Sequence, residues 1–149
     1  MKLSNIVIPT GIAEAGMSVR DVFGLCVDAG VPAVPFRREP GGRPDAWVSL
    51  HQIMKHGCIP EYMIELAEVL GNQLSCLEDA ERKVHEILAK PADPFIRSPI
   101  MSVTSNAPVL KAVAILEKYN SSYLFVFDGD EYRGVITGVG IARRMLEIG

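Results

Sequence analysis

The chain has 149 residues and a formal net charge of −3, so it is large enough for one ordinary domain or for two small units that share a core. This charge provides no broad basic field, which argues against nucleic acid as the main partner. The sequence shows no apolar run of membrane-spanning length and no signal peptide, and its three cysteines lack metal-ligand spacing. We therefore expect a cytoplasmic protein with reduced thiols and no membrane contact.

The first part of the chain is predicted to form one small unit. An extended piece over 5–9 precedes a helix over 18–29, in which apolar residues recur at helical spacing between Ser18, an N-cap, and Gly30, a stop signal. Strands are predicted over 33–37 and 46–48, on either side of a turn rich in glycine and proline. A last helix over 50–55 closes the unit.

An insertion with no counterpart elsewhere in the chain follows. Pro60 and Glu61 mark a helix start, and apolar residues then recur every three or four positions, which predicts one continuous seam. Gly71-Asn72 is predicted to divide the insertion into two helices, which end at the prolines 91 and 94. Two interpretations stay open: the helices cover an exposed face of the molecule, or they form a dimerisation arm. The seam consists of Met63, Leu66, Leu70, Leu74, Leu77, Ala80, Val84 and Leu88.

The last part of the chain repeats the first unit. An extended piece over 95–103, a helix over 108–119, strands over 123–127 and 132–136 and a helix over 138–147 are predicted in the same order. Ile6 aligns with Ile96, and the alignment continues without a gap to Arg38 against Asp128. Such a duplication predicts a pseudo-symmetric body with a cleft between the copies, which favours ligand binding and regulation over catalysis.

The repeated order of five elements resembles tandem CBS-domain proteins, also called CBS pairs or Bateman modules. This resemblance implies an α+β fold of two pseudo-symmetric β-α-β-β-α units, at 1–57 and 93–149, with a helical insertion at 58–92. It also implies a non-enzymatic regulatory module that binds adenosine nucleotides or related compounds and forms a homodimer. The segments that carry the resemblance are Ala33-Val34-Pro35-Phe36, Tyr123-Leu124-Phe125-Val126-Phe127-Asp128, the turn Asp128-Gly129-Asp130, and the closing pieces AWVSLHQI and GVITGVGI.

The resemblance also implies where a ligand binds. In the family a Thr or Ser and an Asp three residues later hold the ribose, and backbone near the middle strand contacts the base. Ser49 and Thr137 keep the hydroxyl, but Gln52 and Gly140 replace the carboxylate. A carboxylate makes strong charge-assisted hydrogen bonds, whereas Gln52 can accept only through its amide oxygen and Gly140 offers only backbone, so we expect a weakened ribose clamp in the first copy and a still weaker one in the second. The predicted ligand-binding residues are Ser49, Gln52, Val34, Thr137, Gly138, Gly140, Leu124 and Arg143. The expected regulatory ligand is AMP, ADP, ATP or S-adenosylmethionine, with no further cofactor.

Other interpretations use the same residues differently. The loss of the carboxylate in both copies is also consistent with a ligand-free dimerisation or protein-interaction module that uses the seam over 63–88. The helix start at Thr137 either contacts phosphate together with Arg143 or is only a capped helix end. Arg37, Arg38 and Arg43 form a basic hairpin tip that either contacts an anionic partner or is simply solvated. His51, His56 and Cys58 are too few for a closed zinc site, and no nucleophile–base grouping is evident, so neither a metal site nor catalysis is predicted.

Overall fold

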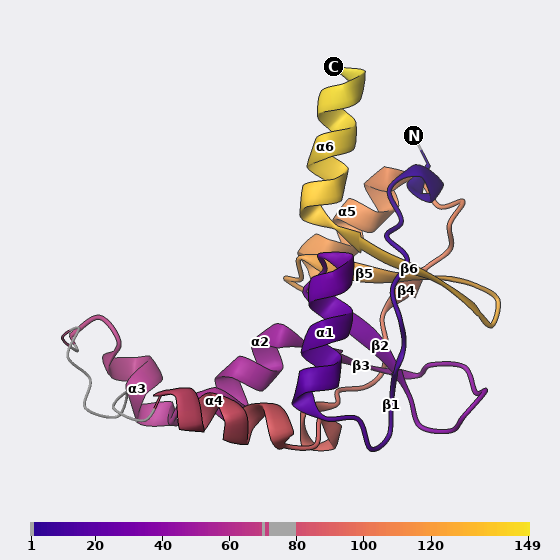
Figure 1. Ribbon diagram of the computed structural model, residues 1–149. Coiled ribbons are helices and arrows are strands. Elements are labelled where there is room, and N and C mark those ends of the chain that lie inside the picture. Colours follow the sequence, from indigo (N-terminus) through magenta and orange to yellow (C-terminus); the bar gives the residue numbers. More distant parts are fainter. Residues whose placement is uncertain (1, 70, 72–79) are drawn as a thin grey trace.

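The computed structural model describes residues 2–69, 71 and 80–149, which form two three-stranded sheets (Figure 1). The first sheet contains β1 (Ala13–Glu14), β2 (Ala33–Arg37) and β3 (Ala46–Ser49), and the second contains β4 (Ser102–Val103), β5 (Tyr123–Asp128) and β6 (Glu131–Thr137). In each sheet the first strand is parallel to the second, and the second is antiparallel to the third. The predicted α+β fold with two repeated units is confirmed.

The helices occupy equivalent places in the two repeats. α1 (Val19–Ala29) and α5 (Val109–Lys118) follow the first strands, whereas α2 (Leu50–Ile53) and α6 (Gly138–Ile148) follow the third. Single 3₁₀ turns lie at Leu3–Asn5 and Asp93–Phe95, and the chain after α2 continues as a π-helical stretch over Met54–Cys58.

The predicted limits of the first helix are confirmed. The hydroxyl of Ser18 accepts a hydrogen bond from Asp21 N–H at 3.2 Å, and the Asp21 carboxylate accepts one from Ser18 N–H at 3.1 Å. This reciprocal capping box supplies partners to backbone groups that a helix start otherwise leaves unpaired. Gly30 ends α1 in the left-handed conformation, with φ 69°, which glycine adopts without steric cost.

Each repeat contributes an extended segment to the sheet of the other. Ile8 N–H donates to Val135 O at 2.8 Å and Val135 N–H to Ile8 O at 2.9 Å, while Trp47 and Arg97 form the matching pair of bonds at 2.9 Å. In Figure 1 the indigo N-terminal segment accordingly runs past β6 before it reaches β1. The expected extended piece over 5–9 is therefore not a strand of its own unit, where β1 begins later, at Ala13.

The core lies on both sides of the second sheet because side chains alternate along its strands. Phe125, Phe127 and Val135 point towards the first repeat, whereas Leu124 and Ile136 join the core beneath α5 and α6. The N-terminal Leu3 is fully buried in that second core. The two repeats therefore share buried apolar surface, which two units of this size need for stability.

The insertion contains α3 (Glu61–Leu66) and α4 (Ala80–Ala89). Only the end of α4 packs on the body: Ile87 and Leu88 contact the first core, and Lys90 O accepts a hydrogen bond from Val19 N–H at 2.8 Å. Leu66 and Val84 are 46% and 52% exposed, and Figure 1 shows α3 and α4 extending away from the sheets. The predicted break at Asn72, the seam residues Leu70, Leu74 and Leu77, and Cys76 lie outside the described residues.

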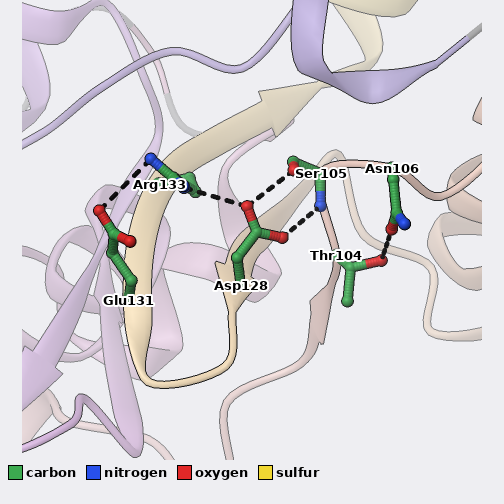
Figure 2. Close-up of polar contacts among 6 residues, drawn as sticks. All are labelled: Thr104, Ser105, Asn106, Asp128, Glu131 and Arg133. Atoms are coloured by element: carbon green, nitrogen blue, oxygen red, sulfur yellow. Dashed lines mark hydrogen bonds and ion pairs between the residues drawn. The ribbon is translucent and has the colours of Figure 1, made fainter.

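The turn between β5 and β6 is anchored by Asp128. Figure 2 shows its carboxylate accepting hydrogen bonds from Ser105 N–H at 3.0 Å, Ser105 Oγ at 2.7 Å and Arg133 Nε at 3.0 Å. These bonds favour the ionised form, so the pKa of Asp128 lies below its ordinary value, with the Ser105 N–H as the largest cause. In the first repeat an ion pair between Glu14 and Arg37 ties β1 to β2.

The arginines of the first hairpin are all engaged within the chain. Arg37 pairs with Glu14, and Arg38 lies 3.7 Å from Asp45. Arg43 reaches the second hairpin, where it lies 3.6 Å from Asp130 and 4.4 Å above the ring of Phe127. The hairpin tip is therefore an internal contact between the repeats, and its charge is balanced by acidic neighbours.

Candidate ligand-binding site

A cavity of about 700 Å³ opens at the junction of β6 and α6. Its volume lies in the range of roughly 300–1,000 Å³ that small-molecule sites occupy. Both repeats build it: the crossing segment and the end of α1 form one wall, and the β6–α6 junction forms the other. The lining residues are Ile8, Ala29, Gly30, Pro32, Ser122, Thr137, Gly138, Val139, Gly140 and Arg143.

Thr137 presents a hydroxyl to this cavity. It is the N-cap of α6, and its Oγ1 accepts a hydrogen bond from Gly140 N–H at 3.0 Å. A hydroxyl donates as well as accepts, so the proton of Thr137 stays available to a bound molecule. Gly138 N–H is already satisfied by Ser122 O at 3.1 Å, a bond within the second repeat.

The cavity is electrostatically positive. Arg143 is the one charged residue of its lining, and no carboxylate, imidazole or thiol is among the lining residues. The positive end of the α6 dipole points to the same place. A smaller hollow of about 180 Å³, lined in part by Ile8, Gly140 and Arg143, lies against the same segment, so the Arg143 side chain borders both spaces. The arrangement is complementary to an anion.

The corresponding place in the first repeat is arranged differently. Ser49 is the N-cap of α2, is 2% exposed, and accepts a hydrogen bond from Gln52 N–H at 3.1 Å. The ring of Tyr123 of the second repeat meets the ring of Trp47 edge-on at 5.9 Å. Burial raises the pKa of Tyr123 to about 12, and the nearby Ser49 side chain opposes this rise.

The structure divides the eight predicted ligand-binding residues into three groups. Four line the cavity: Thr137, Gly138, Gly140 and Arg143. Ser49 and Gln52 lie together at the start of α2, outside it. The side chains of Val34 and Leu124 are fully buried in the two cores, on the central strands, and do not line the cavity.

Sequence reasoning missed the wall that the first repeat supplies. Ile8 enters the cavity because it pairs with Val135, and this pairing has no local signature in the sequence. Gly30 was recognised only as a helix stop. The signal that could have found Gly30 and Pro32 is their alignment with Asn120 and Ser122, since equivalent loops approach each other across a pseudo-twofold axis. The other missed residues are Ala29, Ser122 and Val139.

Two further properties of the described residues bear on other functions. No group of three or more His, Cys, Asp or Glu side chains in this part of the chain is placed to hold a metal ion. Within the same residues, every helix is too short or too polar to cross a membrane.

Comparison with known proteins identifies the class of fold. Residues 92–147 match the family model of the CBS domain. The CBS domain of a CBS domain-containing membrane protein from Sphaerobacter thermophilus superposes with a TM-score of 0.68 at 13% identity, covering 96% of this chain and 86% of that one. No match is found among curated protein sequences.

Two similar structures contain ligands. The CBS domain pair of protein MJ0100, in complex with 5′-methylthioadenosine and S-adenosyl-L-methionine, has a TM-score of 0.66 at 14% identity, covering all of this chain (100%) and 98% of that one. The protein CBSX2, in complex with AMP, has a TM-score of 0.65 at 17% identity, with coverage of 99% and 97%. The resemblance seen in the sequence is confirmed: the chain has the fold of a CBS domain pair, with a CBS domain at residues 92–147.

Proposed function

We propose that this chain is a regulatory module that binds an adenosine nucleotide in the cavity beside Thr137. The observation that supports this most directly is the cavity itself, of about 700 Å³, which has walls from both repeats, a hydroxyl donor and one cation. Similar CBS pairs hold AMP or adenosyl compounds. Because both repeats form the walls, a ligand that favours one relative arrangement of the repeats shifts the conformational equilibrium.

The charge of the cavity favours a nucleotide over S-adenosylmethionine. Arg143 attracts a phosphate and repels a sulfonium cation, and no lining carboxylate offsets it. Within the described residues Arg143 has no ion-pair partner, so its guanidinium is available to a ligand. AMP, ADP and ATP are therefore the preferred ligands of this proposal.

Thermal unfolding with each ligand tests the proposal. A ligand at 100 times its dissociation constant adds about 2.7 kcal/mol of stability, which raises the Tm of a chain of this size by about 5–10 °C. We expect such a shift with AMP, ADP or ATP and a smaller one with S-adenosylmethionine. Arg143→Gln should remove the preference for phosphate. The matched control is Arg20→Gln, an exposed arginine at the opposite end of α1 from Gly30. No shift with any nucleotide at millimolar concentration contradicts the proposal.

The module acts without catalysis in this proposal. The lining of the cavity offers the hydroxyls of Ser122 and Thr137 but no side chain that serves as a general base near neutral pH. Cys26 and Cys58 are free thiols, as expected of a cytoplasmic protein. The regulated partner is another protein, to which the ligand-dependent packing of the repeats is transmitted.

A homodimer is the second part of the proposal, and the insertion favours it. Tyr62, Leu66, Val69 and Val84 are between 46% and 79% exposed on α3, α4 and the chain between them. An apolar surface of this kind is typical of an interaction site. If it joins two chains, Leu66→Glu lowers the mass measured by light scattering, while the control Leu110→Glu, on α5, does not. A monomeric wild-type chain contradicts this part, and a dimer that binds no nucleotide favours the ligand-free interaction module instead.

A further inference from the structure

The two clefts between the repeats differ in the side chains that face them. The strand registers place Ala33 opposite Ser49 in the first sheet and Tyr123 opposite Thr137 in the second, so Ala33 and Tyr123 are equivalent. In the same way Trp47 is equivalent to Val135. Tyr123 and Trp47 pack against each other near Ser49, and the positions equivalent to them hold Ala33 and Val135.

The large pair packs together between the two repeats. The rings of Tyr123 and Trp47 meet at 5.9 Å, and the ring of Phe125 lies 5.8 Å from Tyr123, edge-on in both cases. Such edge-to-face contacts between aromatic rings are favourable in addition to the area they bury. Ala33 and Val135, the equivalent pair, are fully buried and form no aromatic contact, and the cavity of about 700 Å³ beside Thr137 is lined by other residues.

Ser49 is 2% exposed and Thr137 is 9% exposed, so both hydroxyl residues are buried, Ser49 the more completely. The Ser49 hydroxyl accepts a hydrogen bond from Gln52 N–H, and Tyr123 lies close to it. The Oε1 atom of Gln52 is also buried and has no hydrogen-bond partner among the described residues. The Ser49 hydroxyl and the Oε1 atom of Gln52, which would face a ribose in the first repeat, are thus both buried.

We propose that Tyr123 is a built-in occupant of the Ser49 cleft, so that the chain binds one nucleotide, at Thr137, and not two. The choice of nucleotide rests on the proposed function, whereas the closure of the Ser49 cleft does not. In this arrangement Tyr123 is a specificity-determining residue: its ring lies where a second ligand would bind, close to the serine that would hold that ligand.

Trp47 allows the closure to be tested without any ligand, since it is the only tryptophan in the sequence. Tyr123→Ala leaves a cavity beside Trp47, so we expect the Stern–Volmer constant for acrylamide quenching of its fluorescence roughly to double. The matched control is Tyr62→Ala, which removes an exposed tyrosine from α3 and should leave quenching unchanged. An unchanged constant in a folded Tyr123→Ala chain overturns the proposal. If this variant does not fold, Tyr123→Val, which suits a strand better, is judged by the same criterion.

Calorimetric titration with AMP tests the stoichiometry. We expect one AMP per wild-type chain, with little change in Trp47 emission, and a second AMP in Tyr123→Ala that quenches Trp47. Two AMP per wild-type chain overturn the proposal. A wild-type chain that binds no AMP, together with increased quenching by acrylamide in Tyr123→Ala, overturns the proposed function but supports the closure of the Ser49 cleft.

Discussion

The clefts beside Ser49 and Thr137 are built on the same backbone and yet differ in what they can hold. Both begin a helix with a buried hydroxyl that accepts a hydrogen bond from the N–H three residues later, at 3.1 and 3.0 Å. The rings of Tyr123 and Trp47 pack together near Ser49, whereas the large cavity lies beside Thr137. Duplication thus preserves the position of the capping hydroxyl, while the side chains around it differ.

The residues beside the two crossing segments also differ between the repeats. The substitution with the largest expected effect on stability lies at one of these residues. Gly134 has φ 153°, and a Cβ there would lie 2.7 Å from the carbonyl carbon of Ile8, closer than Cβ atoms approach backbone. Its equivalent, Ala46, is buried and already carries a Cβ where Arg97 crosses beside Trp47. We expect Gly134→Ala to lower the free energy of unfolding by at least about 3 kcal/mol through steric overlap and backbone strain.

Urea denaturation at neutral pH measures this loss. The control Ala46→Gly should cost only about 1 kcal/mol, the ordinary cost of glycine in a regular element. Equal losses in the two variants would show that the N-terminal segment does not cross beside β6 as closely as Ile8 and Gly134 indicate.

The missing carboxylates provide the second test of the comparison. A Cβ on Gly140 would make ordinary contacts, 3.4 Å from Thr137 Oγ1 and 3.9 Å from Ile6 O, so Gly140→Asp fits the cavity. Hydrogen bonds from a ribose to a carboxylate contribute about 1.5–3 kcal/mol, part of which is lost to repulsion of the phosphate. We expect AMP to bind about tenfold more tightly, which corresponds to about 1.4 kcal/mol.

Titration of AMP and of 2′-deoxy-AMP separates this effect from a general change in affinity. The deoxy compound lacks one of the two hydroxyls and should gain less. Gln52→Asp, the same change in the closed cleft, should give no gain because Tyr123 covers Ser49. A gain of equal size in both variants would contradict the difference between the clefts.

Local features of this fold could be predicted from the sequence, and non-local ones could not. The capping box at Ser18 and the stop at Gly30 depend on residues within one turn of each other, so pattern rules located them correctly. β1 contains only two residues and is defined by its partner β2, so its own sequence carries no recognisable alternation. The wall of the cavity at Ile8 depends on a pairing with Val135, which the alignment of the repeats cannot specify.

In the candidate site, too, local features could be predicted from the sequence and contacts between the repeats could not. The repeat identified Ser49 and Thr137 as equivalent hydroxyls, and both are helix N-caps in the structure. The residues favoured the Ser49 cleft, because Gln52 keeps a side-chain acceptor that Gly140 lacks, whereas the large cavity lies beside Thr137, and they indicated no role beyond its own strand for Tyr123. Its contact with Trp47 joins two repeats that are far apart in the chain, and it is visible only when the sheets are packed.

The smallest expected effect concerns alkaline pH and again separates the two clefts. Burial raises the pKa of Tyr123 to about 12, whereas a tyrosine in an unfolded chain titrates near 10. Below pH 10 the phenol is neutral in both states, and its contribution to stability is fully present. As the pH rises from 10 towards 12 the unfolded chain loses this proton before the folded chain does, so stability falls. Tyr132, whose pKa burial also raises to about 12, adds a loss of the same sign.

Phenylalanine at position 123 keeps the ring and removes the ionisable group. We therefore expect the urea midpoint of Tyr123→Phe to fall less than that of the wild type between pH 9 and pH 11.5. The residual fall should match the part due to Tyr132, which Tyr132→Phe measures separately. If Tyr123→Phe loses stability over this range as steeply as the wild type, the phenol of Tyr123 is solvated. The Ser49 cleft would then be as open as the cleft beside Thr137, where alanine stands at the equivalent position.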